Sequence, residues 1–332
     1  MSNPNIGWLF YKELYRKGND SAHIQSKLEE IKKVSSVDTD KLKFGEYGFI
    51  LKTTYPGLII GSGYIHGVSS DDDVKIGFYF DHTTGLPQLP GSSVKGVLRS
   101  FFKSLQNPDK EELALDFFKE VFKEIGYTKE INKEFLGALE DEIFEGIDSK
   151  TKKPLPVYNR DKFFDAVVIE ISNDGLLSED YITPHKEPLK NPVPIKILKV
   201  SGGVSFKFQF DLKDGSITVS EKELLFLKLL LFSGVGAKTN VGYGQFEEWS
   251  DEEFEKLNQK YKRDILKTVD SELEKLKIKL EKGIITNPKS IHDAIKKIES
   301  LSKIEKSTLK KFVDEIITVK EGKWYKKIEK LL

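Results

Sequence analysis

The segment Val204-Ser-Phe-Lys-Phe-Gln-Phe-Asp-Leu212 alternates apolar and polar side chains, which is the period of a strand with one buried face. An almost wholly apolar stretch, Glu221 to Phe232, follows it and predicts a central helix. Gln245 to Trp249 then predicts a returning strand. These residues therefore predict a strand, a helix and a strand that form half of a larger fold.

The same order of elements recurs upstream. Leu58 to Ile60 and Val74 to Phe80 indicate strands. A helical pattern begins near Val94, and Phe163 to Ile171 indicates a buried strand. Strand, helix and strand, repeated twice, is the split pattern of a ferredoxin-like fold. We therefore predict an α+β protein with a ferredoxin-like core, which a helical insertion interrupts at about residues 103–160.

The two ends of the chain differ from this core. Asn3-Pro4 precedes an apolar stripe that predicts a capped helix, and the charged stretch that runs to about residue 44 shows no clear period. From about residue 251 apolar side chains recur every three to four residues, which predicts a helical module over 251–332 beside a core of residues 1–250. Because its lysines are interleaved with glutamates, we expect this module to contact protein rather than RNA.

The composition narrows the function classes. The 332 residues include 53 basic and 53 acidic side chains, so the net charge is zero, whereas a free-standing nucleic-acid binder usually has a basic surplus. Neutrality fits a subunit whose other faces meet protein partners. There is no cysteine, and the five histidines show no ligand spacing, so we expect neither a metal site nor a cofactor. With no apolar run near the ~20 residues of a membrane span and no signal-peptide pattern, we expect a cytoplasmic protein.

A glycine-rich segment, Gly234-Val-Gly-Ala-Lys-Thr-Asn-Val-Gly-Tyr-Gly244, follows the apolar helix. Alanine rather than glycine precedes its lysine, and a helix rather than a strand leads into it, so it is not a nucleotide-binding phosphate loop. Gly236 can admit a ligand close to the backbone, while Lys238 and Thr239 offer a charge and a hydroxyl. Tyr243 offers a ring for base stacking. The alternative interpretation is a tight connection whose tyrosine packs inward.

A second motif, Gly85-Leu-Pro-Gln-Leu-Pro-Gly-Ser-Ser-Val-Lys-Gly-Val-Leu-Arg99, leads the upstream helix. Ser92 or Ser93 is expected to cap that helix, where free amides form an anion site. Lys95 and Arg99 lie one turn apart, so they share a face and could bracket successive phosphates. The alternative is a capped helix with a solvated basic edge.

Three further features have a structural and a functional interpretation. The phenylalanines at 206, 208 and 210 could stack RNA bases, but such a stripe is usually hydrophobic core, and we expect core. Asp71-Asp-Asp73 could bind magnesium or assist RNA cleavage, although adjacent loop carboxylates are usually only solvated. His66 is the one histidine in a glycine-rich loop that suggests a function.

Taken together, the two glycine motifs resemble those of the repeat-associated mysterious protein (RAMP) superfamily of CRISPR systems. Pro90 to Gly96 and Gly234 to Gly244 match its two signature segments in the right order. Within the superfamily the chain is similar to the sixth-subunit family of type III-B (Cmr) effector complexes over about residues 1–250. The supporting segments are Asn5 to Lys12, Tyr181 to His185 and Asn191 to Val200. A departure is Lys186-Glu-Pro-Leu189, where the resemblance leads us to expect tyrosines.

The resemblance implies an RNA-recognition-type core that binds the 3′ region of the guide RNA (crRNA) and caps one end of a filament of backbone subunits. It implies as partners the guide RNA, through it the target RNA, and neighbouring RAMP subunits in antiviral defence. We therefore expect an architectural subunit and not an enzyme. The alternative is a RAMP-type endoribonuclease or target-cleaving backbone subunit that uses Asp71 to Asp73. The predicted RNA contacts are Ser92, Ser93, Lys95, Arg99, Gly236, Lys238, Thr239, Tyr243 and His66.

Overall fold

The computed structural model describes residues 5–18, 20–34, 37, 39, 42–61, 79–182, 194–250, 276, 280, 287–296, 298, 306, 309–310, 313–314, 317 and 323–332. The chain divides into two compact units, Met1–Trp249 and Ser250–Leu332. Each unit has its own apolar core, and each is therefore described by itself.

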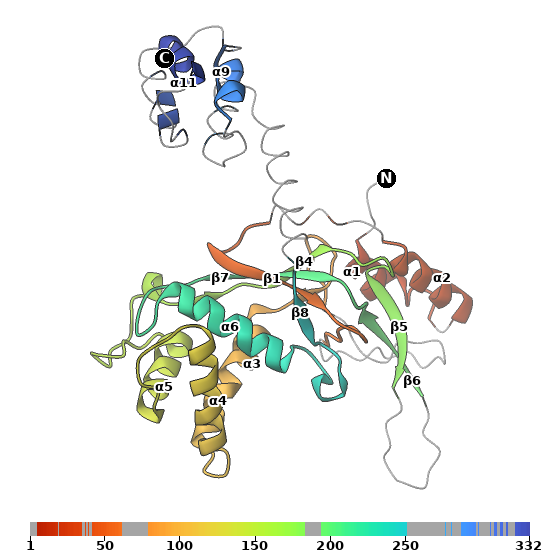
Figure 1. Cartoon of the computed structure of the whole chain (residues 1–332). Coiled ribbons are helices and arrows are strands. Elements are labelled where there is room, and N and C mark those ends of the chain that lie inside the picture. Colours follow the sequence, from red (N-terminus) through yellow and green to blue (C-terminus); the bar gives the residue numbers. More distant parts are fainter. Residues whose placement is uncertain are drawn as a thin grey trace. The chain divides into compact units, whose positions relative to one another are not determined.

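An antiparallel sheet with the strand order β2-β4-β7-β1-β8 forms the centre of the larger unit (Figure 1). Its strands are β1 (Tyr47–Thr53), β2 (Gln88–Leu89), β4 (Ala166–Glu170), β7 (Ser205–Asp211) and β8 (Phe246–Glu248), and β3 (Lys162–Phe163) also pairs with β7. Helix α3 (Gly91–Lys103) joins β1 to β4 in the chain, and α6 (Val219–Ser233) joins β7 to β8. Two such units in the order β4-β7-β1-β8 make a ferredoxin-like sheet, so the predicted α+β class is confirmed.

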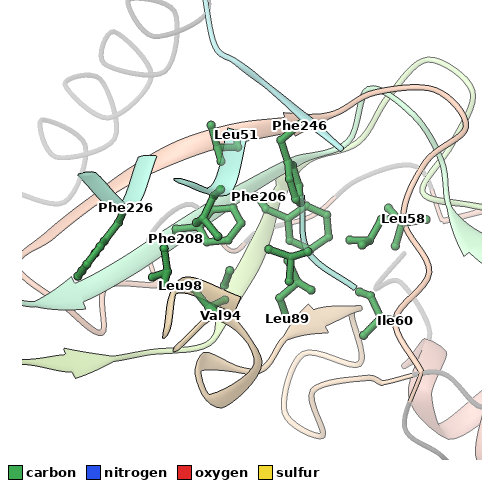
Figure 2. Close-up of a cluster of buried hydrophobic side chains, with 14 of the residues drawn as sticks. Leu51, Leu58, Ile60, Leu89, Val94, Leu98, Phe206, Phe208, Phe226 and Phe246 are labelled. Atoms are coloured by element: carbon green, nitrogen blue, oxygen red, sulfur yellow. The ribbon is translucent and has the colours of Figure 1, made fainter. Parts of the chain in front are cut away.

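The core lies between this sheet and the helices on one of its faces. Figure 1 shows α3 and α6 on the same side of the sheet, and Figure 2 shows Val94 and Leu98 of α3 facing Phe206 and Phe208 of β7. Phe206, Phe208 and Phe210 are 0%, 1% and 0% exposed. Burial of each ring stabilises the fold by about 1.5–3 kcal/mol. The stripe is therefore core, as expected, and the stacking-platform alternative is wrong.

The opposite face of β7 is covered in part by the chain itself. The side-chain oxygen of Gln209 accepts a hydrogen bond of 3.0 Å from the Phe44 amide. Lys207 donates to the Leu42 carbonyl at 3.1 Å. Ser205 and Gln209, which the alternation places on this face, are consequently buried. The alternation in β7 predicted that its polar face is exposed to solvent, but residues 42–46 cover part of that face.

Strand β1 lies in the middle of the sheet, although the sequence did not predict it. Phe49 pairs with Phe208 and Leu51 pairs with Phe206 across the β1–β7 ladder. The predicted strand at Leu58 to Ile60 is instead an extended segment that forms one isolated bridge, from Leu58 to Val200. Of the predicted strand at Val74 to Phe80, residues 74–78 lie outside the described part of the chain.

The N-terminal region is more helical than its sequence suggested. Helix α1 (Ile6–Trp8) begins at Asn5, whose side chain accepts from the Trp8 amide at 2.8 Å, and it continues as a π-helical segment, Leu9–Glu13. Helix α2 (Ser21–Lys32) lies in the stretch without a clear period and buries Ile24, Leu28 and Ile31. The predicted helix exists, but its cap is Asn5 rather than Asn3.

Helices also occupy the chain between α3 and β3. They are α4 (Glu111–Glu124), α5 (Lys133–Glu140) and a π-helical segment, Asp141–Glu145. Phe102 of α3 packs against Phe118 of α4 with ring centroids 4.7 Å apart. In Figure 1 α4 and α5 lie on the same side of the sheet as α3. The insertion therefore extends the helical layer rather than adding a separate body.

A separate two-stranded hairpin completes the larger unit. Strands β5 (Leu177–Ile182) and β6 (Ile195–Val200) pair antiparallel, with Leu177 opposite Val200 and Ile182 opposite Ile195. The Leu58–Val200 bridge joins this hairpin to the segment that follows β1. The hairpin therefore reaches the part of the sheet where β1 ends.

In the smaller unit the described helices are α9 (Pro288–Lys296) and α11 (Lys323–Leu331). Its core contains Leu276, Leu280, Ile291, Ile295, Leu309, Val313, Ile317, Tyr325 and Ile328. Leu309, Val313 and Ile317, which recur every four residues, are buried in this core. Within the described residues, no helix of either unit is long and apolar enough to cross a membrane.

Candidate nucleic-acid interface

The glycine-rich loop 234–244 begins where α6 ends. Gly234 is the C-cap of α6 with φ +66°, and Gly244 has φ +69°. The Val235 amide donates to the Gly244 carbonyl at 2.9 Å, which closes the loop on itself. A Cβ atom at Gly244 would overlap the carbonyl oxygen of Val235, so this position accepts only glycine without a shift of the backbone.

The loop is also bonded to the segment that follows β1. The Ala237 amide donates to the Ile59 carbonyl at 3.0 Å, and the Gly244 amide donates to the Gly57 carbonyl at 2.8 Å. A Cβ atom at Gly236 would lie 2.6 Å from the oxygen of Ile59. The group that lies close to Gly236 is therefore the backbone of Ile59 and not a ligand, and Gly236 acts by shaping the loop.

Lys238 is the residue of this loop with the features of a phosphate contact. It is exposed, and its side chain makes no hydrogen bond or ion pair with the described residues. Its backbone is left-handed, with φ 60° and ψ 36°, a conformation that is costly for a residue with a Cβ. Thr239 next to it is half-buried, and its carbonyl accepts from the Gln245 amide group at 3.3 Å. A strained, unpaired lysine at the tip of a rigid loop indicates a functional position.

Tyr243 does not offer its ring to solvent. The side chain is 8% exposed, and its hydroxyl donates to Asp180 Oδ2 at 2.9 Å. Burial, together with this carboxylate, raises the pKa of Tyr243 to about 12. The interpretation of an inward-packing tyrosine is thus the one that the structure matches.

Asp180 is the common hydrogen-bond partner of Tyr243 and Lys199. Burial opposes its ionisation, but hydrogen bonds from Lys199, the Tyr181 amide and Tyr243 lower the pKa of Asp180 below its usual value. Lys199 Nζ donates to Asp180 Oδ2 at 2.6 Å and is largely buried. The ion pair therefore links β5 to β6, and the hydrogen bond from Tyr243 to Asp180 fastens the glycine-rich loop to this hairpin, a contact that the sequence did not reveal.

The helix led by the first motif is not capped by serine. Pro90 is the N-cap of α3, and Ser92 and Ser93 lie exposed in the first turn. The amide of Gly91 donates to Asp165 Oδ1 at 2.7 Å, so a carboxylate of this protein already occupies part of the expected anion site. The prediction of a serine cap is wrong, because Asp165 approaches the helix end from β4's side.

Lys95 and Arg99 point to the insertion. Lys95 Nζ donates to the Phe144 carbonyl at 2.7 Å, and Arg99 Nε donates to Glu140 Oε1 at 2.9 Å. Arg99 also forms an ion pair with Glu145. Hydrogen bonds with these carboxylates, that with Glu140 first, raise the pKa of Arg99. The two side chains share a face, as expected, but in the structure their partners are protein groups.

The structure therefore separates the two motifs. Among the described residues they share no hydrogen-bond or ion-pair partner, because the first contacts β3, β4 and the insertion, whereas the second contacts residues 57–59 and Asp180. His66 and Asp71 to Asp73 lie outside the described residues. In the part of the chain that is described, no group of three or more histidine or acidic side chains could hold a metal ion.

The ferredoxin-like sheet, with a glycine-rich loop after its second crossover helix, defines the class of protein to which the chain belongs. Residues 50–247, more than half of the chain, match the RAMP superfamily. The protein therefore belongs to the RAMP superfamily.

Among characterised proteins, the chain is similar to the CRISPR system Cmr subunit Cmr6 of Pyrococcus furiosus, with 30% identity over 50% of this chain and 59% of that protein. The chain thus spans about three fifths of the length of this relative.

Two solved structures are similar as well. The crystal structure of Cmr6 from Pyrococcus furiosus has 23% identity and a TM-score of 0.39, covering 61% of this chain and 97% of that chain. The cryo-EM structure of the type III-B Cmr-beta complex bound to cognate target RNA has 23% identity and a TM-score of 0.40, covering 70% and 67%.

Proposed function

We propose that this protein is a guide-RNA-binding architectural subunit of a type III-B CRISPR effector complex. It holds the 3′ region of the guide and caps one end of the backbone filament, next to a neighbouring RAMP subunit. Target RNA reaches it through base pairing with the guide. Membership of the RAMP superfamily and the similarity to Cmr6 support this role.

One observation carries the RNA-binding part of the proposal. Lys238 is exposed and left-handed at the tip of a loop that is bonded to Gly57 and Ile59. A backbone fixed in this way orders the lysine before RNA arrives, so little conformational entropy is lost on binding. Lys238 contacts a guide phosphate, and Thr239, Ser92 and Ser93 are supporting contacts. Lys95 and Arg99 contribute only where RNA displaces their present partners.

The proposed role is not enzymatic. The alternative, a ribonuclease that uses Asp71 to Asp73, predicts that assembled complex cleaves labelled target RNA at a position that depends on these carboxylates. Replacing the three aspartates by alanine should leave every cleavage product in place if the subunit is architectural. Loss of one product while target binding is retained would establish the alternative.

The role at the guide 3′ end is tested by reconstitution. Complex assembled with and without the full chain is bound to end-labelled guide RNA, and the RNA is probed by nuclease footprinting. We expect the chain to protect the 3′ region alone and to change the length distribution of the backbone filament. Protection at the 5′ end, or assembly that is the same without the chain, would contradict the proposal.

A further inference from the structure

Tyr55 is the most exposed large aromatic side chain among the described residues, at 90%. It lies in a tight turn, Thr54 to Gly57, which the Gly57 amide closes by donating to the Thr54 carbonyl at 2.7 Å. Tyrosine in such a position leaves most of its apolar ring in water, which is unfavourable without a partner. Packing in the core therefore does not explain why a tyrosine occupies this position.

The turn that presents Tyr55 is rigid. The Thr54 amide donates to the Gln245 carbonyl at 3.0 Å, and the Gly57 carbonyl accepts from Gly244 at 2.8 Å. A Cβ atom at Gly57 would overlap the Val200 carbonyl oxygen, so the turn is pressed onto β6. Tyr55 and the glycine-rich loop that carries Lys238 therefore belong to one connected piece of backbone.

A buried cation lies behind the tyrosine ring. Lys199 Nζ is 5.9 Å from the ring centroid of Tyr55 and 5.8 Å from that of Tyr243. Its 2.6 Å bond to Asp180 fixes it in place, and the residue is 9% exposed. The ammonium group attracts one face of the Tyr55 ring. The ring is thus held near the protein while most of its surface remains accessible.

We propose that Tyr55 is a stacking platform for one unpaired nucleobase of the RNA strand whose phosphate Lys238 contacts. This inference rests on the proposed guide-RNA function and names a residue for it. Base stacking on an aromatic ring is tolerant of sequence, because every base has a π-face. A subunit that must accept guides of any sequence needs this type of contact. Tyr55 supplies the ring that Tyr243, which packs inward, does not.

The test uses the full chain and fluorescein-labelled single-stranded RNA of mixed sequence, with binding measured by anisotropy over a range of salt concentrations. Tyr55→Ala should weaken binding by roughly 5- to 100-fold, the range for loss of one stacked base, and should leave the salt slope unchanged. Tyr55→Phe should bind as the unaltered chain does. The matched control is Tyr158→Ala, since Tyr158 is 83% exposed but lies in the insertion.

A second arm replaces single nucleotides of the RNA by abasic sites. At the stacked position the abasic RNA should bind the unaltered chain more weakly and bind Tyr55→Ala with no further loss, since both changes remove the same contact. Independent losses at every position would overturn the inference.

The remaining outcomes are distinguishable. If the unaltered chain binds RNA and Tyr55→Ala binds equally well, the stacking inference fails and the proposed function stands. If Tyr55→Ala binds RNA normally but is lost from the assembled complex, Tyr55 contacts protein and the inference also fails. If the unaltered chain binds no RNA, alone or in the complex, the proposed function fails with it.

Discussion

The hydroxyl of Tyr243 donates a 2.9 Å hydrogen bond to Asp180, and this bond ties the end of the glycine-rich loop to strand β5. The two residues are 63 positions apart, and Tyr243 is buried, whereas Tyr55 and Lys238 are exposed. The stability of the loop and its capacity to present those two side chains therefore depend on a contact that does not itself touch RNA.

Removal of this hydroxyl should change the stability in a pH-dependent manner. The pKa of Tyr243 is raised from 10 to about 12, so the folded state retains a proton that the unfolded state loses first. The stabilisation is present below pH 10 and is lost as the pH rises through about 12, by up to about 2.5 kcal/mol. Between these values the unfolding free energy of the native chain should fall more steeply with pH than that of Tyr243→Phe. Parallel curves in urea unfolding would contradict this.

Arg99 should act as a structural cation. Glu140 is 8% exposed through its side chain, and Arg99→Met leaves it with only the 3.4 Å bond from Gln106 among the described residues. We expect a loss of about 2–3 kcal/mol in chemical unfolding, because an unpaired buried carboxylate is costly. The double variant Arg99→Met, Glu140→Gln should recover most of it. A stable single variant with a reduced salt slope in RNA binding would instead make Arg99 a phosphate contact.

Gly244 should tolerate no side chain, because a Cβ atom there would overlap the backbone. Gly18 separates this overlap from the cost of a positive φ alone. Gly18 and Gly244 have similar backbones, with φ +61° and +69°, but a Cβ atom meets nothing within 4 Å at Gly18 and overlaps the Val235 carbonyl at Gly244. Gly18→Ala should therefore cost about 1 kcal/mol from backbone strain alone. Gly244→Ala should cost about 3 kcal/mol or more in thermal unfolding. Equal losses would show that the loop relaxes without difficulty.

Lys238 should show opposite effects on stability and binding. Lys238→Gly removes the left-handed strain, so the unfolding free energy should rise by up to about 1 kcal/mol. The same change should lower the salt slope of single-stranded RNA binding by roughly 0.7, the value for one lost phosphate contact. Lys152 has φ 56° and is the matched control. Lys152→Gly should gain similar stability and leave RNA binding unchanged. If Lys152→Gly also lowered the salt slope, Lys238 would no longer be assigned as a specific phosphate contact.

A chain that ends at Trp249 should fold. Among the described residues, the core of the larger unit includes no side chain beyond Phe246, and that of the smaller unit begins at Leu276. The shortened chain should show one cooperative thermal transition and should bind guide RNA. It should be lost from the assembled complex if residues 251–332 contact a protein partner. If the shortened chain assembles as the full chain does, residues 251–332 are not needed for contact with a partner.

Regular elements with a strong local pattern were predictable. Strand β7 shows a period of two, and α6 has an almost wholly apolar sequence, so both were located from local signals. Strand β1 was missed because Gly48 and Ile50 break its alternation. Helices cover one face of the sheet, and residues 42–46 cover part of the other face at β7. The sheet therefore does not require a polar side chain at every position of its second face.

For the candidate site, the sequence placed residues on their local elements but did not reveal their contacts. Sequence spacing placed Lys95 and Arg99 on one face of a helix, but their partners, Phe144 and Glu140, lie 49 and 41 residues further along the chain. The inward position of Tyr243 depends on Asp180, which lies 63 residues earlier in the chain. Tyr55 carried one usable signal, because Tyr-Pro-Gly is a turn sequence.

The bonds from Gly244 to Gly57 and from Ala237 to Ile59 also decide when the proposed RNA-binding loop first forms. Each joins residues about 180 positions apart, so chain entropy delays the loop until most of the larger unit has collapsed. A growing polypeptide lacks the loop until residue 244 has left the ribosome, and a chain broken before that point never acquires it. Truncated products therefore lack the loop that we propose contacts the guide RNA.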